Sequence, residues 1–347
     1  MTSLRPPADD GTLRVAVVGA TGNVGTAVLR TLAEDPRIGS VVGIARRVPR
    51  ETVPKAEWAA ADITDDSADL VGLFAGADAV IHLAWLFQPA RYPAVTWRTN
   101  VLGSIRVFEA VATAGVPALV YASSVGAYSP GPQDHAVPES WPTHGWPEAA
   151  YPREKAYVER VLDAFELRHP GIRVVRLRPG FIFQRAAASE QRRLFAGPLV
   201  PGRLVRPGVV PVVPDLPGLR FQALHADDAA EAYRLAVVRP VRGAFNIAAG
   251  PVVDPRLLGE LLRARVVRLP AAAATAALRA LWQLHAVPVP PGLLRTVLRL
   301  PLMDTGRAAR ELGWEPRRTA RDALEELLHG LREAAGGPTP PLASAPR

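Results

Sequence analysis

The chain has 347 residues, 48% of them hydrophobic, which is enough to bury a sizeable core in one large domain or two closely joined ones. The formal net charge of +8 does not indicate nucleic-acid binding, because the basic residues are almost all arginines scattered singly or in pairs. Cysteine is absent, which excludes disulfides, thiolate metal sites and cysteine nucleophiles.

The sequence shows neither a secretory signal nor an uninterrupted apolar stretch of about 18 residues, the length that a membrane-spanning helix needs. We therefore expect a cytoplasmic protein without membrane insertion. Residues 1–12 are expected to form a flexible leader. Residues 336–347, rich in proline, alanine and serine, are expected to form a disordered tail.

Short apolar runs alternate with helical patterns along the first half of the chain. Such runs are typical of strands buried on both faces of a parallel sheet. The predicted strands are residues 13–18, 40–45, 58–61, 79–83, 119–122 and 174–178. The predicted helices between them are residues 24–33, 66–74, 99–114 and 150–168. This alternation predicts an α/β fold with a doubly wound parallel sheet of the Rossmann type.

The later part of the chain is less regular. Residues 185–220 contain many prolines and glycines and are expected to form irregular loops. Two strands, a helix between them and three C-terminal helices are predicted at residues 221–226, 244–248, 227–237, 270–285, 291–300 and 319–333. Residues 221–248 are expected to return to the large sheet. The apolar stretches 271–285 and 293–302 are interpreted as helices over a pocket rather than on a membrane surface.

A glycine-rich segment, Gly19-Ala-Thr-Gly22-Asn-Val-Gly25, follows the first predicted strand and leads into a helix. In such loops one glycine makes a tight turn, another lets the backbone approach a pyrophosphate, and a third allows close helix–strand packing. The free N–H groups of the helix N-terminus then bind the phosphates. A plain glycine turn is the alternative, but this context predicts a dinucleotide site formed by Gly19, Thr21, Gly22, Asn23, Val24 and Gly25.

A second motif, Tyr151-Pro-Arg-Glu-Lys155, places a phenol and an ammonium on one face of a helix. A nearby cation lowers the pKa of a tyrosine, which can then exchange a proton with a substrate oxygen. A surface pair on a helix is the alternative. Two observations favour catalysis: Lys155 is one of only two lysines, and the Ser123-Ser124 pair follows an apolar run at the expected sheet edge.

With its Gly-x-x-Gly-x-x-Gly spacing and these motifs, the chain resembles the extended short-chain dehydrogenase/reductase superfamily, the NAD-dependent epimerase/dehydratase family. The resemblance implies that Tyr151 is the acid/base and that Ser124, with Ser123 as the fallback, orients the reacting carbonyl. It also implies that Lys155 lowers the tyrosine pKa and holds the nicotinamide ribose. The family likeness suggests a homodimer through the helix of Tyr151.

Further segments match the family in order, so that residues 13–180 form the expected dinucleotide-binding domain. The resemblance adds these residues to the cofactor site: Asp62, Ile63, Leu83, Ala84, Asn100 and Pro179. His82 is interpreted as structural. The segment His225-Ala-Asp227-Asp228 resembles a latch between the two parts of the protein, and no further ligands accompany it, so we expect no metal site.

The substrate site is expected to include Trp85, Phe87, Ser124 and Val125, with residues 181–335 as a smaller, mainly helical substrate-binding part. The loop with Trp141 and Trp146 is a further candidate for an apolar pocket. Such a pocket favours a hydrophobic small molecule over a nucleotide sugar.

One reaction of the family can be argued against. Sugar 4,6-dehydratases of similar fold place acidic residues after the catalytic serine or threonine, whereas Val125 and Gly126 follow Ser124 here. Three candidate functions remain. The first candidate interconverts a carbonyl and a secondary alcohol by hydride transfer. The second is an NAD-dependent sugar-nucleotide epimerase with a transient keto intermediate. The third is a non-catalytic dinucleotide-sensing regulator, a class that typically lacks the Tyr/Lys pair.

The choice of cofactor depends on the end of the second predicted strand. NAD-preferring members carry an acidic residue there, which accepts a hydrogen bond from the ribose 2′-hydroxyl. The position falls on Ala45, and the arginines Arg46 and Arg47 follow. Arginines facing solvent are the alternative, but a guanidinium matches a 2′-phosphate well. The sequence therefore favours NADP(H), with NAD(H) possible.

Overall fold

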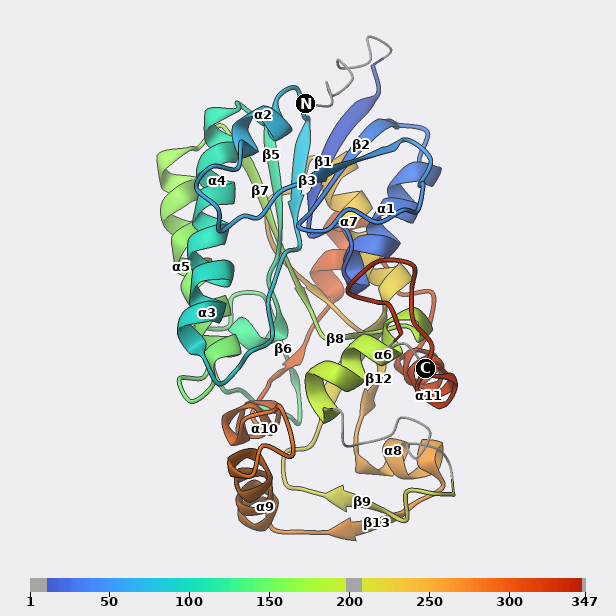
Figure 1. The fold of residues 1–347 in the computed structure, drawn as a ribbon. Helices are drawn as coiled ribbons and strands as arrows, with labels where there is room; N and C mark the ends of the chain where they lie inside the picture. The colour runs from blue at the N-terminus through green and yellow to red at the C-terminus, as the bar shows by residue number, and fades with distance from the viewer. Residues whose placement is uncertain (1–10, 198–207, 345–347) are drawn as a thin grey trace.

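The structure is a computed structural model that describes residues 11–197 and 208–344 (Figure 1). Most of the expected leader (residues 1–10) and the last three residues of the expected tail lie outside the described residues. Among the residues that are described, no helix is long and apolar enough to cross a membrane.

A seven-stranded parallel sheet forms the centre of the upper part of the molecule in Figure 1. Its strands are β1 (Leu13–Val18), β2 (Ile38–Ala45), β3 (Ala56–Ala60), β4 (Ala79–His82), β5 (Ala118–Ala122), β7 (Arg173–Pro179) and β11 (Gly243–Ile247). The order across the sheet is β11-β7-β5-β4-β1-β2-β3, and every neighbouring pair is parallel. The predicted doubly wound sheet is confirmed.

Helices cover both faces of this sheet. One face carries α1 (Asn23–Glu34) and α7 (Ala226–Val238), and the other carries α2 (Leu70–Phe74), α4 (Gly103–Thr113) and α5 (Ala150–Arg168), as Figure 1 shows. A short helix, α3 (Pro93–Trp97), continues through a π-helical turn, η1 (Arg98–Leu102), into α4.

Successive side chains of a strand point to opposite faces of the sheet, so alternate residues of β1 belong to two different hydrophobic cores. Val15 and Val17 pack in the cluster that includes α1 and α7, whereas Ala16 and Val18 pack in the cluster that includes α4 and α5. Burial on both faces explains why the strands are nearly continuous apolar runs.

The winding of the sheet reverses between β1 and β4. β2 and β3 lie on one side of β1, and β4, β5, β7 and β11 lie on the other. Loops that leave the carboxyl ends of neighbouring strands diverge at such a point and leave a crevice, where open α/β sheets bind their ligands.

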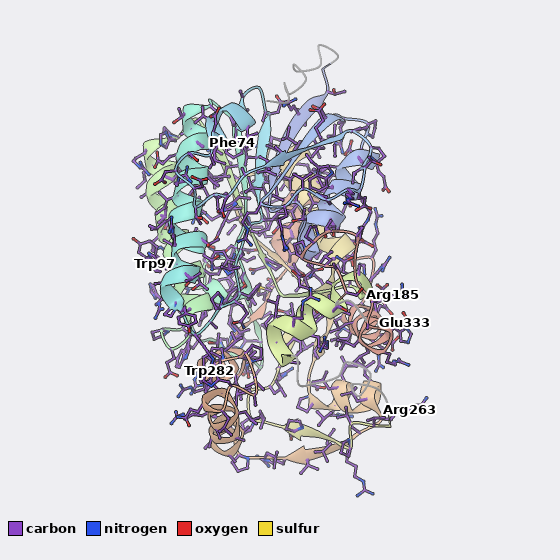
Figure 2. All side chains as sticks on the ribbon, viewed as in Figure 1. Phe74, Trp97, Arg185, Arg263, Trp282 and Glu333 are labelled. Carbon is purple, nitrogen blue, oxygen red and sulfur yellow. The ribbon has the colours of Figure 1, made fainter. Side chains whose placement is uncertain are left out.

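The lower part of the molecule combines helices with small sheets (Figure 1). Its strands are β8 (Phe181–Phe183), β10 (Phe221–His225) and β12 (Ala249–Val253) in one sheet, β9 (Val212–Asp215) with β13 (Arg265–Arg268), and β6 (Ala136–Val137) with β14 (Leu302–Met303). Its helical segments are η2 (Val125–Ala127), η3 (Arg185–Ala187), α6 (Ala188–Gln191), η4 (Arg192–Ala196), α8 (Pro255–Leu262), α9 (Ala271–Gln283), α10 (Pro291–Val297), η6 (Ala308–Leu312) and α11 (Ala320–Glu333). Contacts such as that from Arg185 Nε to the Glu333 carboxylate, 2.9 Å, join these segments (Figure 2).

Three expectations need correction. The loop predicted at residues 185–220 contains the helical segment η3–α6–η4 and the strand β9. Within residues 221–248, β11 joins the large sheet, but β10 pairs with β8 and β12 in the smaller one. Residues 336–344 are not disordered: Thr339 Oγ1 donates to the backbone oxygen of Thr21 at 2.7 Å, and Leu342 is buried. Because this segment is rich in small residues, its composition did not predict the contacts of Thr339 and Leu342 with the folded chain.

Candidate active site

A cavity of about 700 Å³ opens at the carboxyl ends of the parallel strands. The expected site residues that line it are Gly19, Thr21, Gly22, Asn23, Val24, Gly25, Arg46, Asp62, Ile63, Leu83, Ala84, Trp85, Phe87, Ser124, Val125 and Tyr151. Arg47, Asn100, Lys155 and Pro179 do not line it. The fold thus brings together residues from distant parts of the chain.

The three glycines of the loop differ in what surrounds them. Gly19 has a φ of +86°, and a Cβ there would lie 2.6 Å from the backbone nitrogen of Ala84. At Gly25 a Cβ would lie 2.4 Å from the oxygen of Gly19, so this glycine permits the close packing of α1. At Gly22 the nearest atom is 3.6 Å away. Gly19 and Gly25 are therefore required by the fold, while Gly22 keeps space open beside the cavity.

The first turn of α1 can hold an anion. Gly22 is the N-cap residue, no side chain caps the helix, and no acidic residue lies in its first turn. The backbone N–H groups at this end and the helix dipole favour negative charge. This arrangement fits the pyrophosphate of a dinucleotide.

Beyond the glycine loop, the cavity reaches the ends of β2 and β3. Arg46 follows β2 at the cavity with an exposed side chain. Asp62 follows β3, and its Oδ1 accepts hydrogen bonds from the N–H and the hydroxyl of Thr64, at 2.9 and 2.8 Å. This end of the cavity thus carries one cation and one oriented carboxylate.

Tyr151 and Ser124 meet at the middle of the cavity. The Tyr151 hydroxyl donates to Ser124 Oγ at 2.8 Å, and Ser124 Oγ also accepts from the N–H of Gly126 at 2.9 Å. The ring of Phe87 stacks on Tyr151 with 4.8 Å between ring centres. Two hydroxyls within hydrogen-bond distance of each other can together bind and protonate a single substrate oxygen.

Burial raises the pKa of Tyr151 to about 12, and the hydrogen bond with Ser124 only partly opposes this effect. Lys155, which was expected to lower the pKa of this tyrosine, is not among the groups that shift it here. A tyrosine with this pKa is protonated at neutral pH, and it is able to act as a proton donor.

Lys155 is enclosed rather than exposed to the cavity. Its Nζ donates to the backbone oxygen of Ala122 at 2.6 Å and lies 3.4 Å from the centre of the Trp85 ring. Burial lowers the pKa of Lys155 well below its ordinary value, although Glu159 and Glu154 oppose the shift. Trp85, which lines the cavity, thus covers the ammonium group by a cation–π contact.

Three successive turns of α5 are bonded to consecutive residues at the end of β5. Tyr151 contacts Ser124, Lys155 contacts Ala122, and the carboxylate of Glu159 accepts from Ser123 Oγ at 2.6 Å. Ser123, the fallback for the orienting serine, thus bonds to Glu159, whereas Ser124 bonds to Tyr151.

Glu159 is fully buried and neutralises two arginines of β7. It bonds to Arg176 at 3.0 Å and to Arg178 at 2.9 and 3.0 Å. Burial opposes ionisation of this carboxyl group, but the two arginines outweigh burial and lower its pKa to about 2. The ionised form therefore stabilises the fold.

Glu159→Gln is expected to lower the free energy of unfolding by about 3–5 kcal/mol, since it leaves the buried guanidinium of Arg178 without a counter-charge among the described residues, whereas Arg176 keeps its ion pairs with Asp163 and Glu166. Urea denaturation at neutral pH measures this effect. In the wild type, the contribution of Glu159 is complete above its ordinary pKa of about 4.5 and is lost as the pH falls toward 2. Glu109→Gln, at an exposed pair with Arg168, is the control and should cost less than about 1 kcal/mol. An equal loss in both variants would contradict this assignment.

Other residues singled out in the sequence have structural contacts. Asn100 Nδ2 donates to the backbone of Leu86 at 2.9 Å and to the carboxylate of Glu154 at 2.7 Å, so it fixes the loop after β4 instead of contacting the cavity. His82 is buried against Ser104, 2.9 Å away, and burial lowers its pKa to about 3. Neither residue lines the cavity, and both bond to neighbouring groups of the protein.

The segment expected to form a latch joins α7 to α11. His225 Nδ1 accepts from the N–H of Asp227 at 3.1 Å, and its Nε2 lies 3.0 Å from the Glu326 carboxylate. Asp228 accepts from the N–H groups of Arg317 and Arg318, both at 3.0 Å. These polar groups bond to the protein itself.

Sequence reasoning missed most of the wall opposite the sheet. This wall consists of Glu190, Gln191, Leu194, Phe195, Leu278, Leu293, Leu294 and Val297, from α6, η4, α9 and α10. The expectation that the apolar C-terminal helices pack over a pocket agrees with this wall, but its individual residues had no distinctive signal. Trp141 and Trp146 do not line the cavity, since Trp141 bonds to Ser129 and Trp146 lies under Arg299.

Comparison with known proteins now decides the family. The pattern of the NAD dependent epimerase/dehydratase family matches residues 15–248. The chain belongs to this family. An uncharacterized protein of Mycobacterium tuberculosis is 27% identical over 328 residues, which cover 91% of this chain and 83% of that protein. The UDP-glucose 4-epimerase of Yersinia pestis is 32% identical over 169 residues, 45% of this chain and 49% of that enzyme.

The fold of this family member also matches solved structures. The UDP-glucose 4-epimerase of Thermus thermophilus in complex with NAD has a TM-score of 0.68 at 20% identity. The match covers 93% of this chain and 100% of that one. At this identity the likeness concerns the fold alone.

Proposed function

We propose that this family member is an NADP(H)-dependent oxidoreductase that interconverts a hydrophobic ketone and the corresponding secondary alcohol. One observation carries the choice of substrate class. The wall formed by α6, η4, α9 and α10 is mainly aliphatic and aromatic, and among the described lining residues Arg46, at the end of β2, is the only cation. The diphosphate of a nucleotide sugar needs cations or N–H groups around it, whereas a hydrophobic ketone needs the apolar surface that is present.

Each of the two hydroxyl groups has its own role in this proposal. Ser124 Oγ, held by the N–H of Gly126, donates a hydrogen bond to the substrate carbonyl and orients it. Tyr151 transfers its proton to the same oxygen as the carbonyl carbon is reduced. When bound, the reduced nicotinamide supplies the hydride. The tyrosine pKa of about 12 keeps the proton on Tyr151 at neutral pH, so that the residue can supply the proton that reduction of a ketone needs.

The decisive experiment compares two reactions of the purified protein. Oxidation of NADPH in the presence of hydrophobic ketones is expected, together with no interconversion of UDP-glucose and UDP-galactose. Interconversion of the two sugar nucleotides without NADPH oxidation would instead support the sugar-nucleotide epimerase. Two of the proteins named above favour this alternative, because both are UDP-glucose 4-epimerases and the Thermus thermophilus structure holds NAD.

The preference for NADPH rests on Arg46. This residue lies at the cavity at the end of β2, whereas its neighbour Arg47 does not line the cavity, which supports Arg46 as the proposed contact of a ribose 2′-phosphate. Arg46→Ala should weaken NADPH binding by about 1.5–3 kcal/mol, the value of a hydrogen bond to a charged group, and leave NADH binding unchanged. Calorimetry with both cofactors measures this difference.

Arg47→Ala is the matched control and should bind both cofactors like the wild type. A wild-type protein that binds NAD ten-fold more tightly than NADP would contradict the preference. It would also move the epimerase to first place, because epimerases that oxidise a bound sugar and then reduce the keto intermediate usually hold NAD and recycle it.

A further inference from the structure

Segment 337–344 follows α11 and turns back to the glycine loop, as the dark red trace in Figure 1 shows. Thr339 is only 1% exposed, and its Oγ1 donates to the backbone oxygen of Thr21 at 2.7 Å. Thr21 immediately precedes Gly22, the N-cap residue of α1. The segment is thus attached directly to the loop whose geometry fits a pyrophosphate.

The same segment is also attached to the opposite wall of the cavity. Arg193 of η4 donates to the backbone oxygens of Pro341 and Ala343, at 2.7 and 2.9 Å. The next two residues of η4, Leu194 and Phe195, line the cavity. Segment 337–344 therefore connects the dinucleotide-binding part of the chain with the wall on the substrate side.

Pro341 itself lines the cavity, and the segment around it has a fixed shape. The N–H of Gly337 donates to the backbone oxygen of Leu342 at 2.9 Å, and the N–H of Leu342 donates to that of Thr339 at 3.0 Å. Three prolines among residues 338–341 restrict the backbone further, so ordering this turn costs little conformational entropy.

The pattern of the family does not include this segment, because it matches residues 15–248. The glycine motif therefore accounts for the N–H groups that face a pyrophosphate but not for the wall that segment 337–344 adds beside them. Water that reaches a bound phosphate weakens its interaction with those N–H groups, and a wall that excludes water strengthens it.

We propose that segment 337–344 closes the dinucleotide site beside the pyrophosphate and must open before the cofactor can leave. Thr339 is a positioning residue that acts through Thr21, and Arg193 holds the segment from the other side of the cavity. Pro341 forms the wall that excludes water from the phosphates. The inference requires only that the chain binds the dinucleotide, and it does not depend on the substrate or on the reaction.

The test measures the rate constant for dissociation of NADPH from the full chain. An excess of NADP⁺ displaces bound NADPH in a stopped-flow experiment, and the change in NADPH fluorescence gives the rate constant. Thr339→Val removes the hydroxyl that bonds to Thr21, and it should raise this rate constant by about threefold to tenfold, the effect of losing one hydrogen bond. Arg193→Met removes the other attachment and should raise it by at least about threefold.

Two further variants separate closure of the site from a general loss of stability. Thr339→Ser keeps the hydroxyl and should release NADPH at the rate of the wild type. Thr275→Val is the matched control, since Thr275 Oγ1 donates to the backbone oxygen of Ala271 at 2.8 Å within α9 and Thr275 does not line the cavity. Both valine variants lose one bond between a hydroxyl and a backbone oxygen, but only Thr339→Val should release NADPH faster.

An unchanged rate constant in Thr339→Val or in Arg193→Met would overturn the inference. An equal increase in Thr339→Ser or in Thr275→Val would also overturn it, because the effect would then reflect stability instead of closure. The same series is measured with NADH, so a wild type that prefers NAD refutes the proposed cofactor preference and leaves this inference testable by the same rate constants. A wild type that binds neither dinucleotide refutes both.

Discussion

Tyr151→Phe is expected to lower turnover by about 10²–10⁴-fold, the contribution of a positioned proton donor, while cofactor affinity stays unchanged. The substitution removes the hydroxyl that bonds to Ser124 and keeps the ring that stacks on Phe87, so the fold and the cavity wall should persist. Steady-state rates of NADPH oxidation with a ketone that the wild type reduces, together with calorimetry for NADPH, separate the two effects.

Tyr157→Phe is the control for this prediction. Tyr157 lies on the same helix with 45% of its surface exposed and packs against Trp97 instead of the cavity. Its loss should leave turnover at the wild-type level. Near-normal turnover in Tyr151→Phe would show that the proton takes another route and that the assigned acid/base is wrong.

Gly22→Val is expected to reduce dinucleotide affinity by more than about 100-fold, because its side chain would displace a pyrophosphate from N–H groups that each contribute about 1.5–3 kcal/mol. The chain should still fold. Gly22 has extended backbone angles, φ −79° and ψ 179°, which valine adopts readily, and a Cβ there meets no atom closer than 3.6 Å. Calorimetry measures the affinity, and circular dichroism measures the fold.

Gly171→Val provides the matched control, since a Cβ at Gly171 meets no atom within 4 Å and this residue does not line the cavity. Cofactor affinity should be unaffected in this variant. Unchanged affinity in Gly22→Val itself would show that the pyrophosphate does not lie over the glycine loop.

The sequence alone predicted those elements whose burial or ligand binding leaves a local residue pattern. Strands of the large sheet are buried on both faces, so apolar runs such as residues 13–18 revealed them, and the predicted helix over residues 150–168 matches α5. The glycine loop could be predicted because backbone geometry and phosphate binding both require glycine at the same few positions.

The rest depends on long-range packing that no local pattern reports. Glu190 lies in a stretch whose prolines and glycines predicted loops, and only the fold places it in the wall of the cavity. The Tyr-x-x-x-Lys spacing correctly aligned Tyr151 and Lys155, but the position of Trp85 over Lys155 comes from another part of the chain. Burial of Tyr151, which decides its pKa, likewise exists only in the folded chain.

The three bonds between α5 and the end of β5 determine which parts of the chain can change without shifting this helix along the sheet. Tyr151, Lys155 and Glu159 each hold one residue of Ala122–Ser124, so a slip of the helix by one turn, about 5.4 Å, would break all three contacts at once. The alignment of Tyr151 and Lys155 with Ser124 is therefore determined by these contacts and not by the length of the connection between Ser124 and Tyr151. The connection can therefore differ in length or shape without changing how Tyr151, Lys155 and Glu159 meet the end of β5.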